Sequence, residues 1–422
     1  MTLRLLPTNP GLALHLRPGL NDHIELQRLV VEDQPISGVV FDPVLATRQA
    51  ELLDACRGRG IETVLDTRVM ELALPGSADR AGLGRVPWAP IGRLPAAALT
   101  GDASDELIEQ VVAYVGRNRL GAVLAPTHFI SGVDDPAFAV DRRLTGELRV
   151  ALDRQGLGSV AIYYPLAIPL AALRDGSVSL QLAHRLQAMD IDALWLRFHP
   201  FGSSEFGPVK LLTYITACQN LMSIRLPLLA ERTGTIGLAL AAFGAVGGIE
   251  CGLTLGERFN ISDLLRPPAR GSNAFSPPAR VYIPELGAFL SVEAATRFFE
   301  NPLMRARYGC KDAGCCPKGW SSMLGEPKRH GSVRRIDEVR RLGETPPAER
   351  VDQYLETFLR PATDALVQAA KVEPSLDAAR RRYEHARVAL GALRKRSRPT
   401  EFALPPRGRR GPAAGKRQPR SL

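Results

Sequence analysis

Three cysteines and one histidine form the group of residues in this sequence with the clearest capacity for chemistry. Cys310, Cys315, Cys316 and His330 follow the spacing C-x4-C-C-x13-H. Three thiolates and one imidazole are the ligands of a closed, tetrahedral structural zinc site. Both adjacent cysteines can bind one ion only if the backbone turns sharply between them. A structural Zn²⁺ is therefore predicted, with a disulfide or three unrelated thiols as the alternatives.

The expected compartment favours a metal over a disulfide. Met1 leads directly into Thr-Leu-Arg-Leu-Leu-Pro, without the apolar core of a signal peptide. We therefore expect a cytoplasmic protein whose thiols stay reduced. No stretch approaches the roughly eighteen uninterrupted apolar residues of a membrane span, so we expect no membrane association.

Four carboxylates make up a second group of candidate residues, because each comes at the end of a predicted strand. Asp42, Asp66, Glu231 and Glu250 are the predicted catalytic residues. Clustered acids can supply both a general acid and a nucleophile or base. The alternative is that they cap helices or form structural ion pairs.

Residues near the same strand ends are candidates for substrate binding. An arginine within a strand is costly to bury unless it meets an anion, a tyrosine can stack on a planar base, and glycines allow a ligand to approach the backbone. The candidates are Arg68, Tyr164, Arg197, His199, Gly247 and Gly248.

The elements that must position these residues follow a β/α alternation through the first 265 residues. Eight short apolar runs are predicted to be strands, and segments whose apolar residues repeat with the period of an α-helix lie between most of them. These runs are Leu12–Leu16, Gly38–Phe41, Glu62–Leu65, Gly121–Ala125, Val160–Tyr164, Ala193–Phe198, Leu226–Ala230 and Val246–Cys251. Apolar strands without alternation indicate a parallel sheet covered on both faces.

Eight such units predict a TIM-type (β/α)8 barrel over residues 1–265. In a barrel, the C-terminal ends of the strands meet at one mouth, where the candidate acids would gather. A doubly wound open sheet is the alternative, although the glycine-rich phosphate loop common in that fold is absent.

Four further segments follow the predicted barrel. Residues 266–280 read as a Pro/Gly/Ser-rich linker and residues 281–345 as a zinc-binding module that begins with a hairpin and a helix. Residues 346–393 contain two predicted helices, Ala348–Val367 and Leu376–Leu393. Residues 394–422 form a basic tail that is expected to be disordered.

The charge distribution points to an anionic partner for this tail. Of a net charge of +10, residues 394–422 carry ten Lys/Arg against a single Glu, so the remainder of the chain is nearly neutral. Such a tail can contact nucleic-acid phosphates without sequence preference. A merely solubilising terminus is the alternative, and the sequence does not predict an oligomeric state.

This combination resembles the tRNA-guanine transglycosylase superfamily, which includes relatives that insert 7-deazaguanine bases into DNA. The resemblance implies that Asp66 matches the family's acid/base aspartate, that Gly247-Gly248-Ile249 matches its substrate loop, and that the Cys/His set holds zinc. The run Thr-Arg-Val-Met-Glu after Asp66 and the cysteine spacing both depart from the family pattern, and no nucleophilic aspartate is placed by motif.

Base exchange on a guanine of tRNA or DNA is therefore the predicted function, with Asp66 and a further acid at the glycosidic bond. Two other classes remain open. One is a non-catalytic barrel that binds nucleic acid as a scaffold, favoured if the mouth acids pair with arginines. The other is a barrel hydrolase or lyase that acts on a small phosphorylated substrate.

Overall fold

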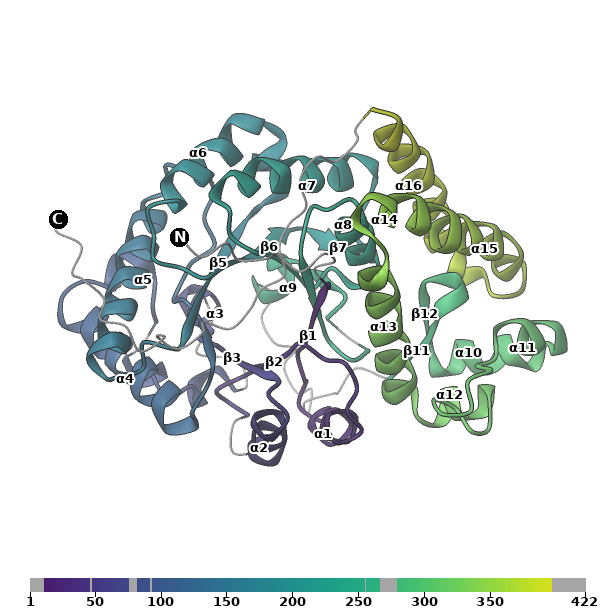
Figure 1. Cartoon of the computed structure of the whole chain (residues 1–422), viewed down its shortest axis with the longest axis horizontal. Helices are drawn as coiled ribbons and strands as arrows, with labels where there is room; N and C mark the ends of the chain where they lie inside the picture. The colour runs from purple at the N-terminus through teal and green to yellow at the C-terminus, as the bar shows by residue number, and fades with distance from the viewer. Residues whose placement is uncertain are drawn as a thin grey trace.

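Eight parallel strands close into a barrel (Figure 1), in the order β1-β2-β3-β4-β5-β6-β8-β9. The computed structural model describes residues 11–45, 48–75, 82–91, 93–254, 256–265 and 279–396. Strand β1 pairs with β9 to complete the ring, with Ala13 opposite Gly248 and Leu16 opposite Cys251. The prediction of a TIM-type (β/α)8 barrel is confirmed.

All eight predicted strands are present within a few residues of their expected bounds. They are β1 (Ala13–Leu16), β2 (Gly38–Phe41), β3 (Glu62–Asp66), β4 (Ala122–Leu124), β5 (Ala161–Pro169), β6 (Ala193–His199), β8 (Leu228–Glu231) and β9 (Gly248–Cys251). Their side chains alternate between the barrel interior and the layer of helices, and both environments exclude water. One apolar cluster, which includes Val64, Leu124 and Trp195, fills the interior of the barrel.

Helices cover the outside of this barrel and shield the outward face of each strand. They are α1 (His23–Val31), α2 (Ala50–Gly58), α3 (Val69–Ala73), α4 (Asp102–Asn118), α5 (Pro136–Arg154), α6 (Gly176–Leu186), α7 (Pro208–Leu221) and α8 (Gly237–Ala242). Local sequence fixes where some of them begin: the Asp135 carboxylate accepts the Ala137 amide, and Pro136 occupies the first turn of α5. No helix of the described residues is long and apolar enough to cross a bilayer.

The chain after β9 first returns to the barrel mouth and then builds a lobe beside the barrel. Strand β10 (Arg258–Phe259) pairs antiparallel with the short strand β7 (Phe201–Gly202), and α9 (Ile261–Leu265) follows it. The predicted hairpin is β11 (Arg280–Ile283) with β12 (Ala288–Ser291), and the predicted helix after it is α10 (Val292–Glu300). Helices α11 (Pro302–Tyr308), α12 (Trp320–Gly325) and α13 (Pro327–Glu344) continue the lobe.

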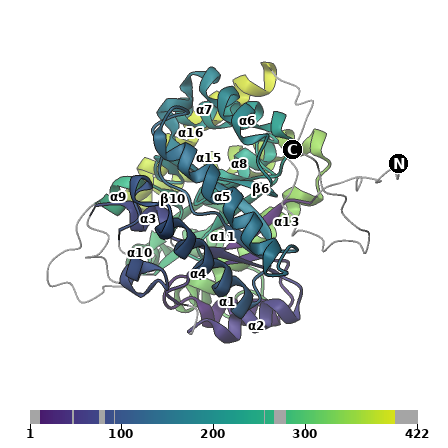
Figure 2. The ribbon, with the colours of Figure 1, turned by 90° about the vertical axis from the view of Figure 1, so that its left-hand side faces the viewer.

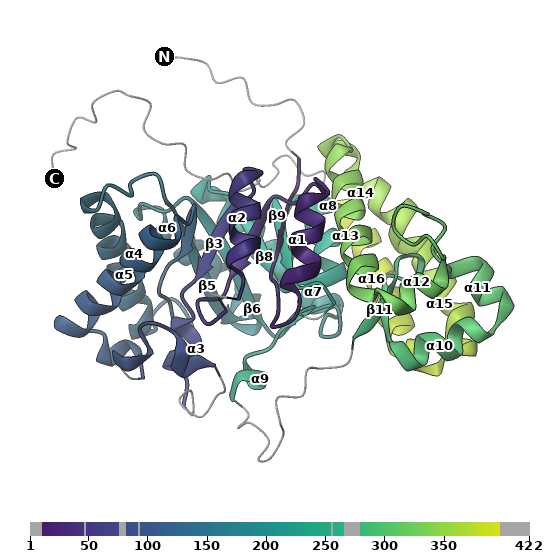
Figure 3. The same cartoon turned by 90° about the horizontal axis from the view of Figure 1, so that it is seen from below.

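Helix α13 was not predicted, and it belongs to the wall of the barrel. It lies between α1 and α8 (Figures 1 and 3), in the position of the eighth barrel helix. Lys328 and Arg329 form ion pairs with Asp22, Glu25 and Glu32 around α1. The predicted module 281–345 therefore contains two parts: a lobe, residues 281–326, inserted after the last strand, and the helix α13 that completes the wall.

The C-terminal helices differ from the prediction in their boundaries. The first is divided into α14 (Arg350–Gln353), a π-helical turn at Tyr354–Leu359 and α15 (Arg360–Val372). Pro361 has no amide proton, so it cannot continue the α-helical ladder at this point. The second, α16 (Asp377–Arg396), includes the first three residues assigned to the tail. The rest of the predicted tail and nearly all of the predicted linker lie outside the described residues.

Candidate functional site

Five charged side chains point inward at the C-terminal end of the barrel. Arg17 follows β1, Asp66 ends β3, Arg197 lies in β6, Glu231 ends β8 and Glu250 lies in β9. Each belongs to the inward-facing series of its strand, because side chains two residues apart share a face. The predicted gathering of Asp66, Glu231 and Glu250 at one mouth is therefore what the barrel geometry produces.

Two guanidinium groups tie the three carboxylates into one network. Arg197 donates through Nη2 to Asp66 at 2.8 Å and through Nε to Glu231 at 2.5 Å. Arg17 donates to Asp66 at 2.6 Å and to Glu250 at 3.0 Å. Relative exposure is 1 % for Asp66, 3 % for Glu231 and 0 % for Glu250. Asp66 therefore joins the two arginines at the centre of a network that is almost fully shielded from water.

The pKa values of the three carboxyls do not shift in the same direction. Burial raises the pKa of Asp66, but the charges of Arg197 and Arg17 outweigh it and bring the pKa far below its usual range. At Glu231 burial also raises the pKa, and the charges of Arg197 and Arg17 again outweigh it, so the pKa is lowered. Burial prevails at Glu250 and, with the charge of Glu231, raises its pKa. The network thus contains two ionised carboxylates and a third carboxyl that takes up a proton more readily.

Asp42 belongs to a neighbouring set of ion pairs centred on Arg68. The Arg68 guanidinium pairs with Asp42 and lies 3.2 Å from Glu71, and the Arg68 amide donates to Asp66 at 3.0 Å. Arg68 has a left-handed backbone (φ 57°), which is uncommon for a residue with a side chain. Arg68 therefore orients Asp66 through its backbone, while its side chain is occupied by other acids.

Three of the predicted substrate-binding residues are not at the mouth. Tyr164 points outward and packs against Phe138 of α5, with ring centroids 6.5 Å apart. Gly247 and Gly248 lie at the opposite, N-terminal end of β9. A methyl group on Gly248 would lie 3.0 Å from Cβ of Ala13, so close packing of strands explains this glycine. The predicted placement of these three residues at the mouth was wrong, because an apolar run does not show which face of a strand a residue occupies or where the strand begins and ends.

His199 lies at the rim of the mouth, as predicted. Its Nδ1 accepts the Ile261 amide at 3.0 Å, and its ring meets Phe129 and Phe259 edge-on. Burial, followed by the charge of Lys210, lowers the pKa of His199. His199 is therefore a neutral hydrogen-bond acceptor here. His128, which follows β4, is instead held inside the protein by Asp141 and the Leu94 carbonyl.

Arg17 is a member of the charge network that was not predicted from the sequence. It reaches three carboxylates, yet a single arginine before Pro18 matches no motif. The available signal was its place immediately after the first predicted strand, where inward-facing residues approach the mouth.

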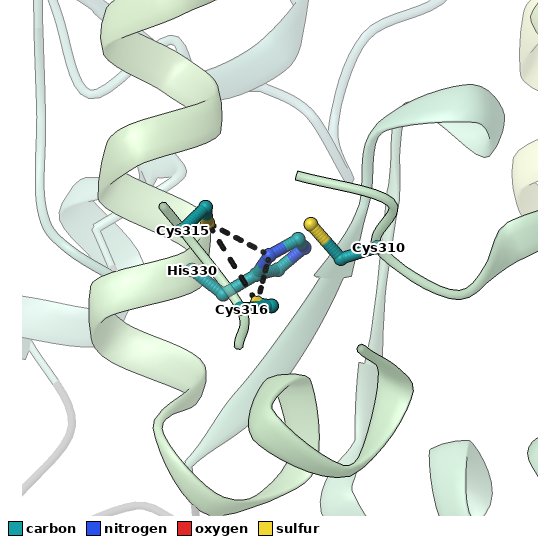
Figure 4. A group of neighbouring side chains, drawn as sticks. All are labelled: Cys310, Cys315, Cys316 and His330. Carbon is teal, nitrogen blue, oxygen red and sulfur yellow. Dashed lines mark hydrogen bonds between the residues drawn. The ribbon is translucent and has the colours of Figure 1, made fainter. Parts of the chain in front are cut away.

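The second candidate site is the Cys/His cluster in the lobe (Figure 4), where the four predicted ligand side chains converge. Cys315 and Cys316 have their sulfurs 3.7 Å apart, and these lie 3.5 and 3.3 Å from Nδ1 of His330. All four potential ligand atoms lie within 4.8 Å of one another. A tetrahedron with bonds of about 2.0–2.3 Å has edges of about 3.5–3.8 Å, so the donor set fits a four-coordinate metal.

The local backbone explains how adjacent cysteines both reach the cluster. The Asp312 carboxylate accepts the amides of Gly314 and Cys315, and the Asp312 carbonyl accepts that of Cys316. The hydrogen bond from Cys316, with further help from His330, lowers the pKa of Cys315 to about 5. The chain therefore supplies the sharp turn and favours the thiolate at Cys315, while the same hydrogen bond raises the pKa of Cys316.

His330 is positioned from outside the cluster as well. It lies in the first turns of α13, and its Nε2 faces the Tyr282 carbonyl of β11 at 3.1 Å. This contact fixes the tautomer with the proton on Nε2, which leaves Nδ1 free to bind a metal. A metal here would connect the hairpin lobe to the helix that completes the barrel wall.

Comparisons with known proteins return solved structures only. No family model and no curated protein matches the chain. The citrate synthase SbnG is 10 % identical over 57 % of this chain and 86 % of its own, with a TM-score of 0.32. The endo-1,4-beta-xylanase XylE of Penicillium canescens is 13 % identical over 56 % and 81 %, with a TM-score of 0.35.

A third similar structure spans more of this chain. The carboxyl transferase domain of Rhizobium etli pyruvate carboxylase is 10 % identical over 91 % of this chain and 61 % of its own, with a TM-score of 0.38. Likenesses this weak carry no argument about activity. The function has to be argued from the two sites.

Proposed function

We propose that this protein is a barrel enzyme that exchanges a guanine base in tRNA or DNA through glycosidic-bond chemistry at the mouth. The observation that carries the proposal is the network of Asp66, Glu231 and Glu250, which places ionised and protonatable carboxyls around shared arginines. The resemblance to the transglycosylase superfamily supplies the substrate class. The Cys/His cluster on the barrel-closing helix supports that resemblance.

The pKa directions suggest roles for these carboxyls. Ionised Asp66 attacks C1′ of the nucleotide, the bond from C1′ to the base nitrogen breaks, and Glu250 donates the proton that the departing base takes up. The incoming base then returns a proton to Glu250 and displaces Asp66 from C1′, so charge and protons balance. These roles differ from the resemblance, which assigns acid/base work to the position of Asp66.

Zn²⁺ is the metal that we propose for Cys310, Cys315, Cys316 and His330. Its role is structural, because four protein ligands leave no open coordination position for chemistry. The basic segment at the end of the chain is the proposed contact with nucleic-acid phosphates.

Asp66→Asn tests the proposal. With tRNA and duplex DNA as substrates and radiolabelled guanine as the incoming base, the wild type should incorporate label. Asp66→Asn should lower incorporation by about 10³-fold or more, and Glu250→Gln by about 10²-fold or more. Asp105→Asn, on the exposed face of α4, is the matched control and should retain full activity.

A non-catalytic scaffold is the second candidate, favoured by the pairing of all three mouth carboxylates with arginine. On this alternative the wild type incorporates no base from any donor, and Asp66→Asn binds nucleic acid as tightly as the wild type does. Label incorporation that depends on Asp66 would exclude it.

A further inference from the structure

The segment from Arg258 to Leu265, which we call the strap, packs over Ala167 of β5, whose partner in the β5–β6 pairing is Arg197 of the charge network. Strap elements β10 and α9 lie at the same end of the barrel as α3 (Figures 2 and 3). Residue Arg258 pairs with Gly202, directly after β6. A methyl group on Gly202 (φ 141°) would lie 2.3 Å from Cα of Arg258, so this contact requires glycine.

Apolar side chains of the strap close against the far side of the mouth. Phe259 and Ile261, which are 2 % and 6 % exposed, form a separate cluster with Met70 of α3 and Ala167 of β5. Partly buried Leu74, Phe129 and Leu264 pack against this cluster. The strap therefore spans from the exit of β6 to the side chains that follow β3 and line β5.

The polar contacts of the strap lie at its edges. The Ile261 amide donates to Nδ1 of His199 at 3.0 Å. Arg258 pairs at 2.9 Å with Glu205 on the rim and with Asp263 in the strap itself. These ion pairs are partly exposed, and the hydrogen bonds of the strap, including the short pairing of β10 with β7, are weak individually. Apolar contact therefore accounts for most of the closure.

Closure of this kind conflicts with access for a substrate. Asp66, Glu231 and Glu250 are at most 3 % exposed while the strap is in place. Gly256, with φ 75°, precedes the strap at a backbone conformation that a residue with a side chain rarely adopts. A movement of the strap therefore has to precede any reaction at the carboxylates.

We propose that the strap is a lid that holds the mouth closed in the free protein and swings away to admit substrate. Phe259 and Ile261, which we call the seal, close the lid through apolar contacts, and Nδ1 of His199 accepts a hydrogen bond from the lid backbone. The identity of the mouth as the reacting site rests on the proposed function, but opening of the lid is measurable without any reaction.

The test is thiol labelling of Ala167→Cys, a position beneath the strap that is 1 % exposed. With the strap intact, modification by iodoacetamide should be slow. Adding Phe259→Ala or Ile261→Ala should accelerate it at least tenfold. Leu265→Ala is the matched control in the same helix, because Leu265 is 50 % exposed and outside the seal, and it should leave the rate unchanged.

Native Cys218 of α7, which is 0 % exposed, reports global unfolding in the same samples and should remain unlabelled. Equal labelling of the thiol introduced by Ala167→Cys, with and without the strap substitutions, would overturn the lid. Faster labelling in a protein that exchanges no base would support the lid and contradict the proposed function, so the two proposals fail separately.

Discussion

At the scale of single residues, Arg17 determines whether three acids can coexist in the barrel. Its guanidinium faces Asp66, Glu231 and Glu250, and it is itself only 13 % exposed. A buried charge that loses its partner is far more costly than the pair was favourable. The network is therefore stable only when its arginines and carboxylates are all present, because removal of one group leaves a buried charge without its partner.

Arg17→Leu should destabilise the protein by roughly 3–5 kcal/mol, because it removes one of the two cations that compensate the buried, ionised Asp66 carboxylate. Urea denaturation followed by circular dichroism measures this change. Arg360→Leu, which removes an exposed pair with Glu356, should cost less than about 1 kcal/mol. Equal costs in the two variants would mean that the mouth network adds nothing to stability.

Glu338 gives a second prediction, on the pH dependence of stability. Burial, only partly offset by Arg335, raises its pKa to about 7 from 4.5, and Tyr282 donates to it at 2.7 Å. Between these two pH values the folded state binds more protons than the unfolded state, so this group lowers the free energy of unfolding as pH rises. The loss amounts to on the order of 3 kcal/mol by pH 7 and above.

Glu338→Gln retains an acceptor for Tyr282 and removes the titration. Its stability should therefore fall less than that of the wild type between pH 4.5 and 7 in denaturant titrations. Exposed Glu293→Gln, in an i,i+4 pair on α10, serves as the control and should follow the wild-type profile. Parallel profiles for all three proteins would show that Glu338 ionises normally.

At the scale of elements, the Cys/His cluster acts on helix α13. The helix contributes His330 to the cluster and contacts β1, α1 and α8 of the barrel. Its packing is close: a methyl group on Gly343 would lie 3.0 Å from the Leu12 amide nitrogen. A metal bound at the Cys/His cluster would therefore be connected to closure of the barrel wall.

Cys316→Ser should therefore lose the metal, about one equivalent per chain in the wild type by elemental analysis. Amide exchange should accelerate in α13 more than in α5, on the opposite side of the barrel, because the anchor of α13 is gone. Cys56→Ala, a buried cysteine outside the cluster, should keep the metal. A metal-free wild type, or exchange that rises equally in both helices, contradicts this role.

Elements also show how far the sequence could predict the structure. All eight strands were predicted, because each is an apolar run buried on two faces. Helix α13 was not predicted, because its buried face includes Gly331, Ser332 and Arg335. These residues interrupt the helical repeat of apolar side chains that indicates a buried helix face. Nη2 of Arg335 donates to Thr235 and Glu257, far away in sequence, and such partners cannot be read from local composition.

The same limit applies to the two sites. The convergence of the metal ligands was predicted because three thiols and an imidazole in a short segment match the donor set of a zinc ion. The mouth acids were predicted from their places at strand ends. Tyr164 was assigned to the wrong face of its strand, and Gly247 and Gly248 were assigned to the wrong end of theirs. The pairing of acids with Arg17 and Arg197 depends on barrel closure, which brings together β1, β3, β6, β8 and β9.

At the scale of the whole molecule, the positive charge at the end of the chain predicts its behaviour toward nucleic acid. Seven Lys/Arg follow Arg396. Deletion of residues 397–422 should weaken binding to tRNA or DNA and reduce the slope of log affinity against log salt by up to about 6. Fluorescence anisotropy over a salt series measures both. A scrambled tail of the same composition should restore binding, and an unchanged slope after deletion would remove the tail from the interface.

The place of α13 in the chain also has a consequence for protein synthesis. The ribosome delivers β9 long before the helix that completes its side of the wall, because the hairpin and the helices of the lobe are translated between them. Until α13 is made, the side of the nascent barrel between α1 and α8 is therefore uncovered. Partly folded chains with such exposed apolar surface tend to aggregate. If the Cys/His cluster binds the proposed metal, the supply of that metal during translation would influence how long each newly made chain stays in this state.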